Sequence, residues 1–404
     1  MRLTSVLLPL ATAALVSAQG NVLPQEPFQI DADSTKHLLT HDLIGLHSNL
    51  TSIESVTGNE EGVGEWLVGS LKSQGYHVEK QYIQQHPARF NVVTWSGKRK
   101  QNIKVLLTSH IDTVPPFYPY KHENDKNETI SGRGSVDAKG SVATQIIAVN
   151  KLISASKISP EDVALLYVVG EETGGDGMRK ANSLDLKPQT IIFGEPTEGK
   201  LASGHKGNLG LILQAKGKAA HSGYPWLGRS ANEVLVKVLA ALMELGQNLP
   251  ESDKYGITTF NIGKISGGVA ANVVAQDANA TVAVRIAEGT PDSIRKEISR
   301  AVALAVQDFL KDDMKVEDVI EILYTSAGYG PIDIDHDIPG FEAITVNYGT
   351  DIPWLESTVK GQKRYLYGPG SILVAHSDHE MLTEKELYDA VEGYQEIILH
   401  AVGK

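Results

Sequence analysis

Short apolar runs on either side of a helical run constrain the fold of this chain more than any other feature. Lys104–Ile111, Asp162–Val169 and Gln189–Phe193 are continuous and rich in Val, Ile and Leu, which is typical of strands buried on both faces. Ser141–Ser154 has a helical pattern and lies between the first two runs. A strand, a helix and a strand of these lengths predict a crossover connection, so we expect an α/β domain with a mostly parallel sheet.

A second pattern begins near residue 206. Strand-like and helical runs follow here in the order strand, helix, strand, strand, helix, strand. They are Asn208–Lys216, Ala231–Leu245, Tyr255–Ile265, Ala278–Ala287, Pro291–Leu310 and Val316–Tyr324. This βαββαβ order is that of a ferredoxin-like, two-layer α+β module. We expect it to comprise residues 206–325 and to be inserted into the α/β domain, which would then consist of residues 19–205 and 326–404.

The N-terminus has the pattern of a secretory signal peptide. Arg2 is positively charged, Val6–Val16 is apolar, and Val16-Ser17-Ala18 is a small-residue cleavage site. We therefore expect residues 1–18 to be removed and the protein to be secreted; the alternative is a buried N-terminal helix. No later segment reaches about 18 uninterrupted apolar residues, so no membrane anchor is expected. The candidate glycosylation sites are then the sequons at Asn49, Asn127 and Asn279.

Charge and cysteine content exclude several classes of function. The 404 residues include 37 basic and 49 acidic side chains, which gives a formal net charge of −12. Nucleic acids and anionic membranes bind basic surfaces, so neither is an expected partner. The chain contains no cysteine, which excludes disulfides, thiolate metal sites and cysteine nucleophiles.

Histidine and acidic residues gather at the ends of the predicted strands, where open α/β sheets bind ligands. His110 and Asp112 end the first run and face the same way in extended backbone. Asp112 could accept a hydrogen bond from the second ring nitrogen of a metal-ligating His110. The alternative is a histidine and an aspartate with a purely structural contact.

Two further clusters lie at the start of the predicted helix and after the second run. Asp137 belongs to the glycine-rich turn Gly132–Gly140, where it could also be a simple helix N-cap. Glu171 and Glu172 leave the second apolar run as an adjacent pair. In most proteins such a pair is solvated surface, but the end of a buried strand is a ligand-binding position.

The last two candidates are Glu195, after the third run, and His376, after a glycine-rich turn near the C-terminus. Together the clusters offer nitrogen and oxygen ligands without sulfur, which suit zinc, with cobalt or manganese as substitutes. A carboxylate that bridges two ions would make a two-metal hydrolytic site, where the ions activate a water and polarise a carbonyl. A spare glutamate beside it would be the general base.

Five motifs, in order, make the sequence recognisable. They are His110–Pro115, Gly132–Gly140, Glu171–Gly175, Gly194–Thr197 and Ala375–Glu380. The chain resembles the co-catalytic two-zinc metallopeptidase family of aminoacylase, acetylornithine deacetylase, succinyl-diaminopimelate desuccinylase and glutamate carboxypeptidase, and within it the fungal secreted probable carboxypeptidases. The resemblance covers about residues 40–400. It implies a catalytic domain with an inserted lid or dimerisation domain.

The resemblance also implies which residues hold the metal. His110 and Glu195 would bind one zinc ion, Glu172 and His376 would bind the other, and Asp137 would bridge the two.

Two other roles follow from the same motifs. Asp112 would orient His110, and Glu171 would be the general base that takes a proton from the attacking water and passes it to the leaving amine. The family usually has a cis peptide after the bridging aspartate, which here is the bond Asp137–Ala138.

Matches in the predicted insert and near the C-terminus concern the substrate. His221 would stabilise the oxyanion, often from the partner subunit of a dimer in this family; otherwise it would be a surface turn residue. Asn272 and Arg285 match substrate-binding positions, and Arg285 could grip a free carboxylate. The alternative for Arg285 is a strand-face salt bridge. The turn that contains Gly370 could place backbone N–H groups near the same carboxylate.

These observations favour a secreted, zinc-dependent carboxypeptidase that cleaves peptides or N-acyl amino acids beside a free carboxylate. One alternative is an N-acyl-amino-acid amidohydrolase with the same chemistry, and another is a metal-free binding homologue. Nucleotide binding is excluded: Gly194–Lys200 fits G-x-x-x-x-G-K, but Leu201 replaces the required Ser or Thr. A homodimer formed through the lid is an expected assembly.

Overall fold

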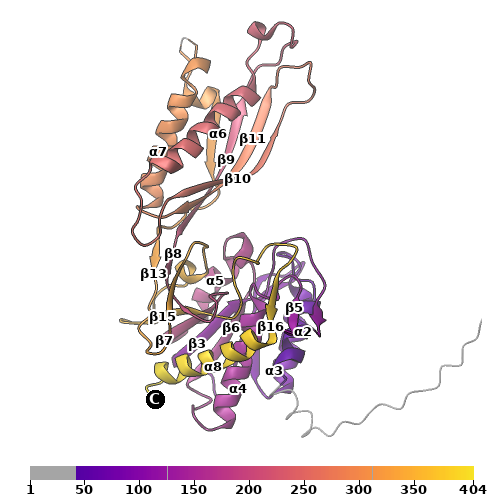
Figure 1. Cartoon of the computed structure of the whole chain (residues 1–404), viewed down its shortest axis with the longest axis vertical. Coiled ribbons are helices and arrows are strands. Elements are labelled where there is room, and N and C mark those ends of the chain that lie inside the picture. Colours follow the sequence, from indigo (N-terminus) through magenta and orange to yellow (C-terminus); the bar gives the residue numbers. More distant parts are fainter. Residues whose placement is uncertain (1–41, 125, 312) are drawn as a thin grey trace, which may run out of the picture.

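The computed structural model describes residues 42–404 except residues 125 and 312, so the predicted signal peptide lies outside the described residues. The chain forms two lobes that follow one another along the long axis (Figure 1). The lower lobe in Figure 1 contains both ends of the described chain. The upper lobe is inserted between β8 (Leu201–His205) and β13 (Ile332–Asp333).

A sheet of six strands in the order β1-β2-β6-β3-β7-β15 forms the centre of the lower lobe. Its strands are β1 (His77–Gln84), β2 (Arg89–Trp95), β3 (Asn102–His110), β6 (Val163–Val168), β7 (Lys187–Gly194) and β15 (Lys363–Tyr367). The strands β6, β3, β7 and β15 are parallel, whereas β2 and β1 extend the sheet in antiparallel pairs. The three apolar runs of the sequence are the three middle parallel strands.

The middle strands contain continuous apolar runs because each face of the sheet packs against a separate layer. In β3, Val105 and Leu107 point into the core beneath the long helices, whereas Leu106 points into the core on the opposite face. The helices of this lobe are α2 (Leu43–Ser52), α3 (Glu61–Ser73), α4 (Lys139–Ser154), α5 (Asp176–Ala181) and α8 (Glu384–Ala401). Within the described residues, no helix is long and apolar enough to cross a membrane.

Two small sheets complete the lower lobe, with the orders β13-β8-β14 and β16-β5-β4. The strands not yet defined are β14 (Ala343–Val346), β4 (Lys121–Glu123), β5 (Thr129–Ser131) and β16 (Met381–Thr383). The first small sheet supplies Ala202 and Val346 to the core on the second face of the central sheet. The second joins a hairpin to the segment that precedes α8.

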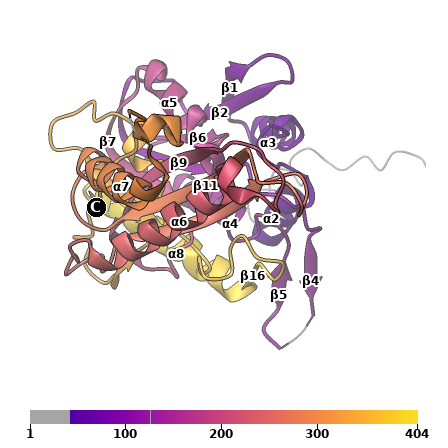
Figure 2. The ribbon, with the colours of Figure 1, turned by 90° about the horizontal axis from the view of Figure 1, so that it is seen from above.

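The upper lobe is an antiparallel sheet in the order β10-β11-β9-β12, with α6 and α7 on one face (Figures 1 and 2). Its elements are β9 (Gly207–Lys216), α6 (Ala231–Asn248), β10 (Thr259–Gly267), β11 (Asp277–Ile286), α7 (Pro291–Ala305) and β12 (Ile320–Tyr324). It has a hydrophobic core of its own, which includes Leu211 and Val282. The predicted fold class, an α/β domain with an inserted βαββαβ module, is confirmed.

Three element boundaries in the upper lobe differ from the predicted ones by four or five residues. The strand expected from Val316 begins only at Ile320, because Val316–Asp318 forms a 3-10 turn. The strand expected from Tyr255 begins only at Thr259, because Ser252 and Gly256 close a tight loop that includes Gly256 at φ 67°. The helix expected up to Leu310 ends at Ala305, because Val306 leaves the helical conformation and a short 3-10 turn follows.

Candidate active site

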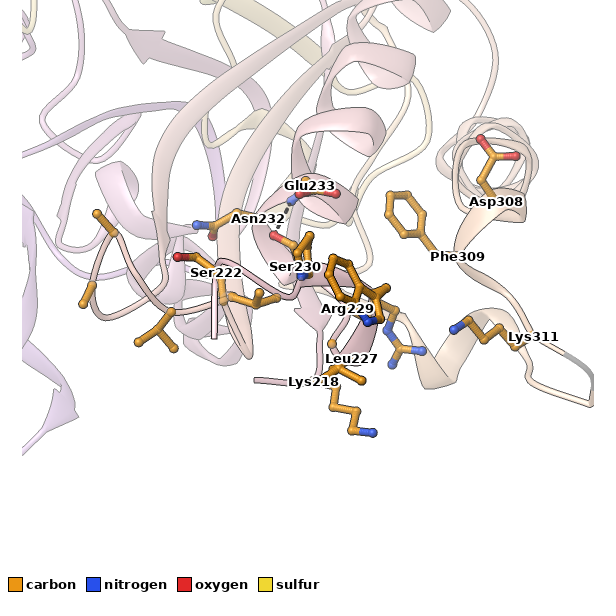
Figure 3. Close-up of a pocket in the computed structure, with 18 of the residues that line it drawn as sticks. Lys218, Ser222, Leu227, Arg229, Ser230, Asn232, Glu233, Asp308, Phe309 and Lys311 are labelled. Carbon is orange, nitrogen blue, oxygen red and sulfur yellow. Dashed lines mark hydrogen bonds between the residues drawn. The ribbon is translucent and has the colours of Figure 1, made fainter. Parts of the chain in front are cut away.

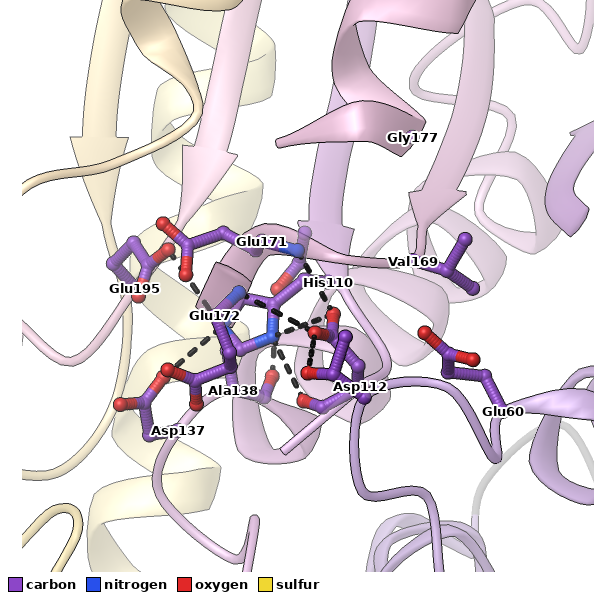
Figure 4. A network of polar contacts seen from close by, with 12 residues as sticks. Glu60, His110, Asp112, Asp137, Ala138, Val169, Glu171, Glu172, Gly177 and Glu195 are labelled. Carbon is purple, nitrogen blue, oxygen red and sulfur yellow. Dashed lines mark hydrogen bonds and ion pairs between the residues drawn. The ribbon is translucent and has the colours of Figure 1, made fainter. Parts of the chain in front are cut away.

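The side chains predicted to hold metal lie together at one edge of the central sheet. Figure 4 shows four of them, His110, Asp137, Glu172 and Glu195. The carboxyl ends of the parallel strands β3, β6 and β7 share this edge, which is where ligands bind in open α/β sheets. Three of the residues end or follow these strands, and two come from the loops before α4 and after β15. We call the set His110, Asp137, Glu172, Glu195 and His376 the Asp137 cluster.

Asp137 lies at the centre of this cluster, and each of its carboxylate oxygens faces a different histidine. Its Oδ1 lies 3.0 Å from His110 Nε2, and its Oδ2 lies 3.2 Å from His376 Nε2. Glu195 Oε1 is 3.8 Å from His110 Nε2, and Glu172 Oε2 is 3.1 Å from His376 Nε2. The cluster therefore consists of two histidine–glutamate pairs that share one aspartate.

The electrostatics of the cluster are those of carboxylates crowded into a buried site. Burial raises the pKa of Glu195 well above its usual value; His110 opposes this shift, and Asp137 adds to it. Burial likewise raises the pKa of Glu172, and repulsion from Asp137 reinforces the effect. Hydrogen bonds to Asp137 and Glu172 raise the pKa of His376 to about 10. Such a site favours positive charge among the carboxylates, as a proton or as a cation.

Asp112 is fully buried and connects two of the motif loops. Its carboxylate accepts hydrogen bonds from Thr57 Oγ1 at 2.7 Å and from the backbone amides of Glu171 at 3.2 Å and Glu172 at 3.3 Å. His110 Nδ1 lies 2.9 Å from the backbone carbonyl of Asp112 and 3.6 Å from its carboxylate. The ring of His110 is thus oriented mainly by the backbone of Asp112, and the carboxylate holds the Glu171–Glu172 turn, which the sequence did not predict.

Two non-functional interpretations of the sequence are wrong, namely Asp137 as a helix N-cap and the two glutamates as solvated surface. Ala138, and not Asp137, is the N-cap of α4, and no side chain caps that helix. The peptide bond between Asp137 and Ala138 is cis, as the resemblance implies. The side chain of Glu172 is only 6% exposed and Glu171 is half-buried, so this pair is not solvated surface.

The upper lobe places His221 and Asn272 far from the Asp137 cluster of the same chain. The strand β9 runs from Gly207, beside the lower lobe, to Lys216, and its ten residues span about 30 Å. His221 and Asn272 lie in the loops beyond that distant end, where the amide of Ser222 donates to the carbonyl of Asn272 at 3.0 Å. The chain does not bring these two predicted residues to the cluster.

Arg285 lies at the near end of the same sheet, paired with Asn208. A Cβ added at Gly349 in the lower lobe would lie 3.2 Å from Arg285 Nη1 and 2.2 Å from the Tyr329 hydroxyl, so the three groups meet at one point. Burial raises the pKa of Tyr329, with Glu171 adding to the shift and Arg285 opposing it. Among the described residues none forms an ion pair with Arg285, so it is not a strand-face salt bridge.

Gly370 packs against the loop that carries Asp137. A Cβ at Gly370 would lie 2.9 Å from Val136 Cγ1, and its φ of 74° favours glycine. The amide of Gly368 in the same turn donates to Thr197 Oγ1 at 3.0 Å, so that N–H group is already occupied. The turn thus has a packing role that the sequence did not predict.

A cavity of about 860 Å³ lies in the upper lobe, away from the Asp137 cluster (Figure 3). Trp226, Phe309 and Met314 line it together with Lys218 and Arg229, and no predicted metal ligand does. Its lining comes from three segments, residues 218–233, residues 270–275 before β11 and residues 308–314 after α7. The cavity therefore lies beside His221 and Asn272, whose neighbours Ser222, Ala271 and Val273 line it, but it contains neither a predicted metal ligand nor Glu171.

Comparison with known sequences agrees with this arrangement. Residues 203–310 match the peptidase dimerisation domain of the M20 family. A probable carboxypeptidase of Aspergillus fumigatus is 45% identical over 393 residues, covering 90% of this chain and 87% of that protein. A probable carboxypeptidase of Aspergillus flavus is 43% identical over 427 residues, covering 97% of both chains.

Solved structures show the same fold. A tripeptidase from Staphylococcus aureus superposes with a TM-score of 0.73 at 23% identity, covering 90% of this chain and 98% of that one. The M20 family metallo-carboxypeptidase Sso-CP2 from Sulfolobus solfataricus superposes with a TM-score of 0.69 at 16% identity, covering 89% and 99%. The chain therefore belongs to the M20 peptidase family and is a hydrolase that acts on peptide bonds.

Proposed function

We propose that this protein is a secreted carboxypeptidase with a two-zinc centre, which hydrolyses the amide bond of peptides or N-acyl amino acids beside a free carboxylate. The observation that carries the proposal is Asp137, whose two oxygens face two separate histidine–glutamate pairs. A carboxylate placed in this way suits a bridge between two cations. The sequence identity of 43–45% to proteins named probable carboxypeptidase favours cleavage of the amide bond next to the free carboxylate.

The donor set fits zinc by its chemistry. The Asp137 cluster offers imidazole nitrogens and carboxylate oxygens, which zinc accepts, and the raised pKa values of the buried Glu172 and Glu195 support a site that favours added positive charge. His110 and Glu195 would hold one ion and His376 and Glu172 the other. When bound, such ions would polarise the substrate carbonyl and lower the pKa of water.

Glu171 is not among the candidate metal ligands, so its carboxylate is available for proton transfer. It lies next to Glu195 at the border of the cluster (Figure 4), and Asp112 fixes its backbone amide. As the general base, its carboxylate would take a proton from the attacking water and then deliver it to the leaving amine.

Replacing Glu171 separates proton transfer from metal binding. Glu171→Gln keeps the shape of the side chain but removes the base, so kcat should fall by about 10²- to 10⁴-fold. Zinc content, measured by mass spectrometry on the purified protein, should stay at the wild-type value. Glu342→Gln, at a side chain that is 80% exposed, is the control and should retain wild-type kcat. Full activity of Glu171→Gln would refute the assignment as base.

Arg285 is proposed to bind the free carboxylate of the substrate. It reaches the lower lobe beside Tyr329 and Gly349 and has no ion-pair partner among the described residues. A guanidinium without an ion-pair partner can form a bidentate pair of hydrogen bonds with the carboxylate of a substrate.

Removal of this guanidinium should affect one class of substrate. Arg285→Ala should lower kcat/KM for dipeptides and N-acetyl amino acids with a free carboxylate by about 10- to 100-fold, and much less for the corresponding C-terminal amides. The comparison of dipeptides with N-acetyl amino acids also separates a carboxypeptidase from the amidohydrolase alternative. Arg300→Ala, at an exposed position of α7, serves as the control. An equal loss for acids and amides would contradict the proposed role.

A second subunit would supply His221 and Asn272. Both lie about 30 Å along β9 from the lower lobe, and they belong to the segment that matches a dimerisation domain. In a homodimer, the far end of one upper lobe would lie over the cluster of the other chain, where His221 could donate to the oxyanion.

Mixed dimers test this arrangement. Glu171→Gln and His221→Ala should each be nearly inactive alone, since each dimer then lacks the base or the oxyanion donor at both sites. After denaturation together and refolding, about a quarter of the sites should combine Glu171 of one chain with His221 of the other, and about a quarter of wild-type activity should return. No recovery, with heterodimers demonstrated by differently tagged chains, would show that His221 does not act across the dimer.

Secretion is the remaining part of the proposal. The three sequon asparagines, Asn49, Asn127 and Asn279, are exposed, as an oligosaccharide acceptor must be. Expression of the full chain in a eukaryotic host should give extracellular protein that begins at Gln19 and becomes smaller on treatment with an N-glycosidase. Intracellular protein with an intact N-terminus would rule this out.

A further inference from the structure

Glu380 is a buried glutamate outside the Asp137 cluster, and only 2% of the residue is exposed. Its Oε1 accepts hydrogen bonds from the backbone amides of Gly134 at 2.9 Å, Val136 at 3.0 Å and Asp137 at 3.2 Å. Its Oε2 accepts one from Arg133 Nη1 at 2.6 Å. A single carboxylate thus binds the loop that carries Asp137 at four points.

Each of these contacts is of a strong type. The acceptor is charged, the donors are backbone N–H groups and a guanidinium, and charge-assisted hydrogen bonds are about twice as strong as neutral ones. The backbone of Glu380 adds a further contact, because its carbonyl accepts from the amide of Gly132 at 3.2 Å. Successive amides that converge on one anion hold a loop in one conformation.

The position of Glu380 in the sequence links two parts of the site. It follows His376 by four residues, whereas Asp137 lies 243 residues away. The two loops approach each other between Asp137 Oδ2 and His376 Nε2, at 3.2 Å. Glu380 lies in the same segment as the candidate ligand His376 and holds the backbone of the candidate ligand Asp137.

We propose that Glu380 is a positioning residue that sets the geometry of the bridging Asp137 relative to His376 and thereby the affinity for metal. The proposal rests on the proposed two-metal site. Side chains that orient metal ligands commonly contribute 10- to 100-fold to metal affinity. A purely structural role would instead predict that loss of Glu380 lowers the stability of the fold alone.

The experiment measures zinc affinity and stability on the same variants. Glu380→Ala and Glu380→Gln are prepared metal-free, zinc binding is titrated against a chromogenic chelator, and Tm is measured without metal. Glu380→Ala should bind zinc about 10- to 100-fold more weakly. Glu380→Gln should show a smaller loss, because the amide can still offer one oxygen to the loop amides but places a donor beside Arg133.

Glu386 provides a matched control in the same C-terminal segment. Its Oε2 accepts hydrogen bonds from the backbone amide and the hydroxyl of Thr383, both at 2.8 Å, and so caps α8 without touching the Asp137 loop. Glu386→Ala should lower Tm because a helix cap is lost, but zinc affinity should stay at the wild-type value.

The outcomes separate the two proposals. Unchanged zinc affinity in the Glu380 variants would overturn the positioning role. The same conclusion would follow if Glu386→Ala, with the same Tm as a Glu380 variant, lost as much zinc affinity as that variant. If Glu380→Ala does not fold, the same decision rests on Glu380→Gln, which preserves volume. If the wild-type protein itself binds no zinc, the proposed function fails, and that result is distinct from a defect limited to the variants.

Discussion

The crowding of carboxylates around Asp137 is the constraint on which the rest of the site depends. Burial raises the pKa of both Glu172 and Glu195, and repulsion from Asp137 raises both further. Buried like charges at these separations are costly unless cations or tightly bound donors compensate them. The surrounding structure fixes the backbone of the loops that carry these carboxylates and does not neutralise the carboxylates themselves. Asp112 binds the amides of the Glu171–Glu172 turn, and Glu380 binds those of the Asp137 loop.

The sheet was largely predictable from sequence because its signal is local. The consecutive apolar side chains Val105, Leu106 and Leu107 of β3 can all be buried only if both faces are covered, and Leu106 and Leu107 indeed enter different cores. Parallel strands then place their carboxyl ends together, so the sequence alone predicts that His110 and Glu195 belong to one site.

The parts that the sequence did not predict depend on pairing between distant segments. The strand β14 pairs with β8 across more than 130 residues, and β5 has only three residues, so neither has a periodic pattern of its own. Glu380 was visible as part of a motif, but its partners Gly134 and Val136 lie about 245 residues earlier. No spacing rule connects an acceptor to backbone amides at that separation, because any residue can provide the amide.

The upper lobe has a mechanical consequence for the proposed dimer. The strands β9 and β11 pair without interruption over their full length, so Arg285 at one end and His221 beyond the other are held by one stiff sheet. Arg285 would bind substrate in its own subunit, whereas His221 would serve the partner's site. A rotation of the lobe that brings Arg285 onto a carboxylate must then move His221 relative to the other cluster. Closure of the two sites would be coupled through the sheet itself, without any change inside the lobe.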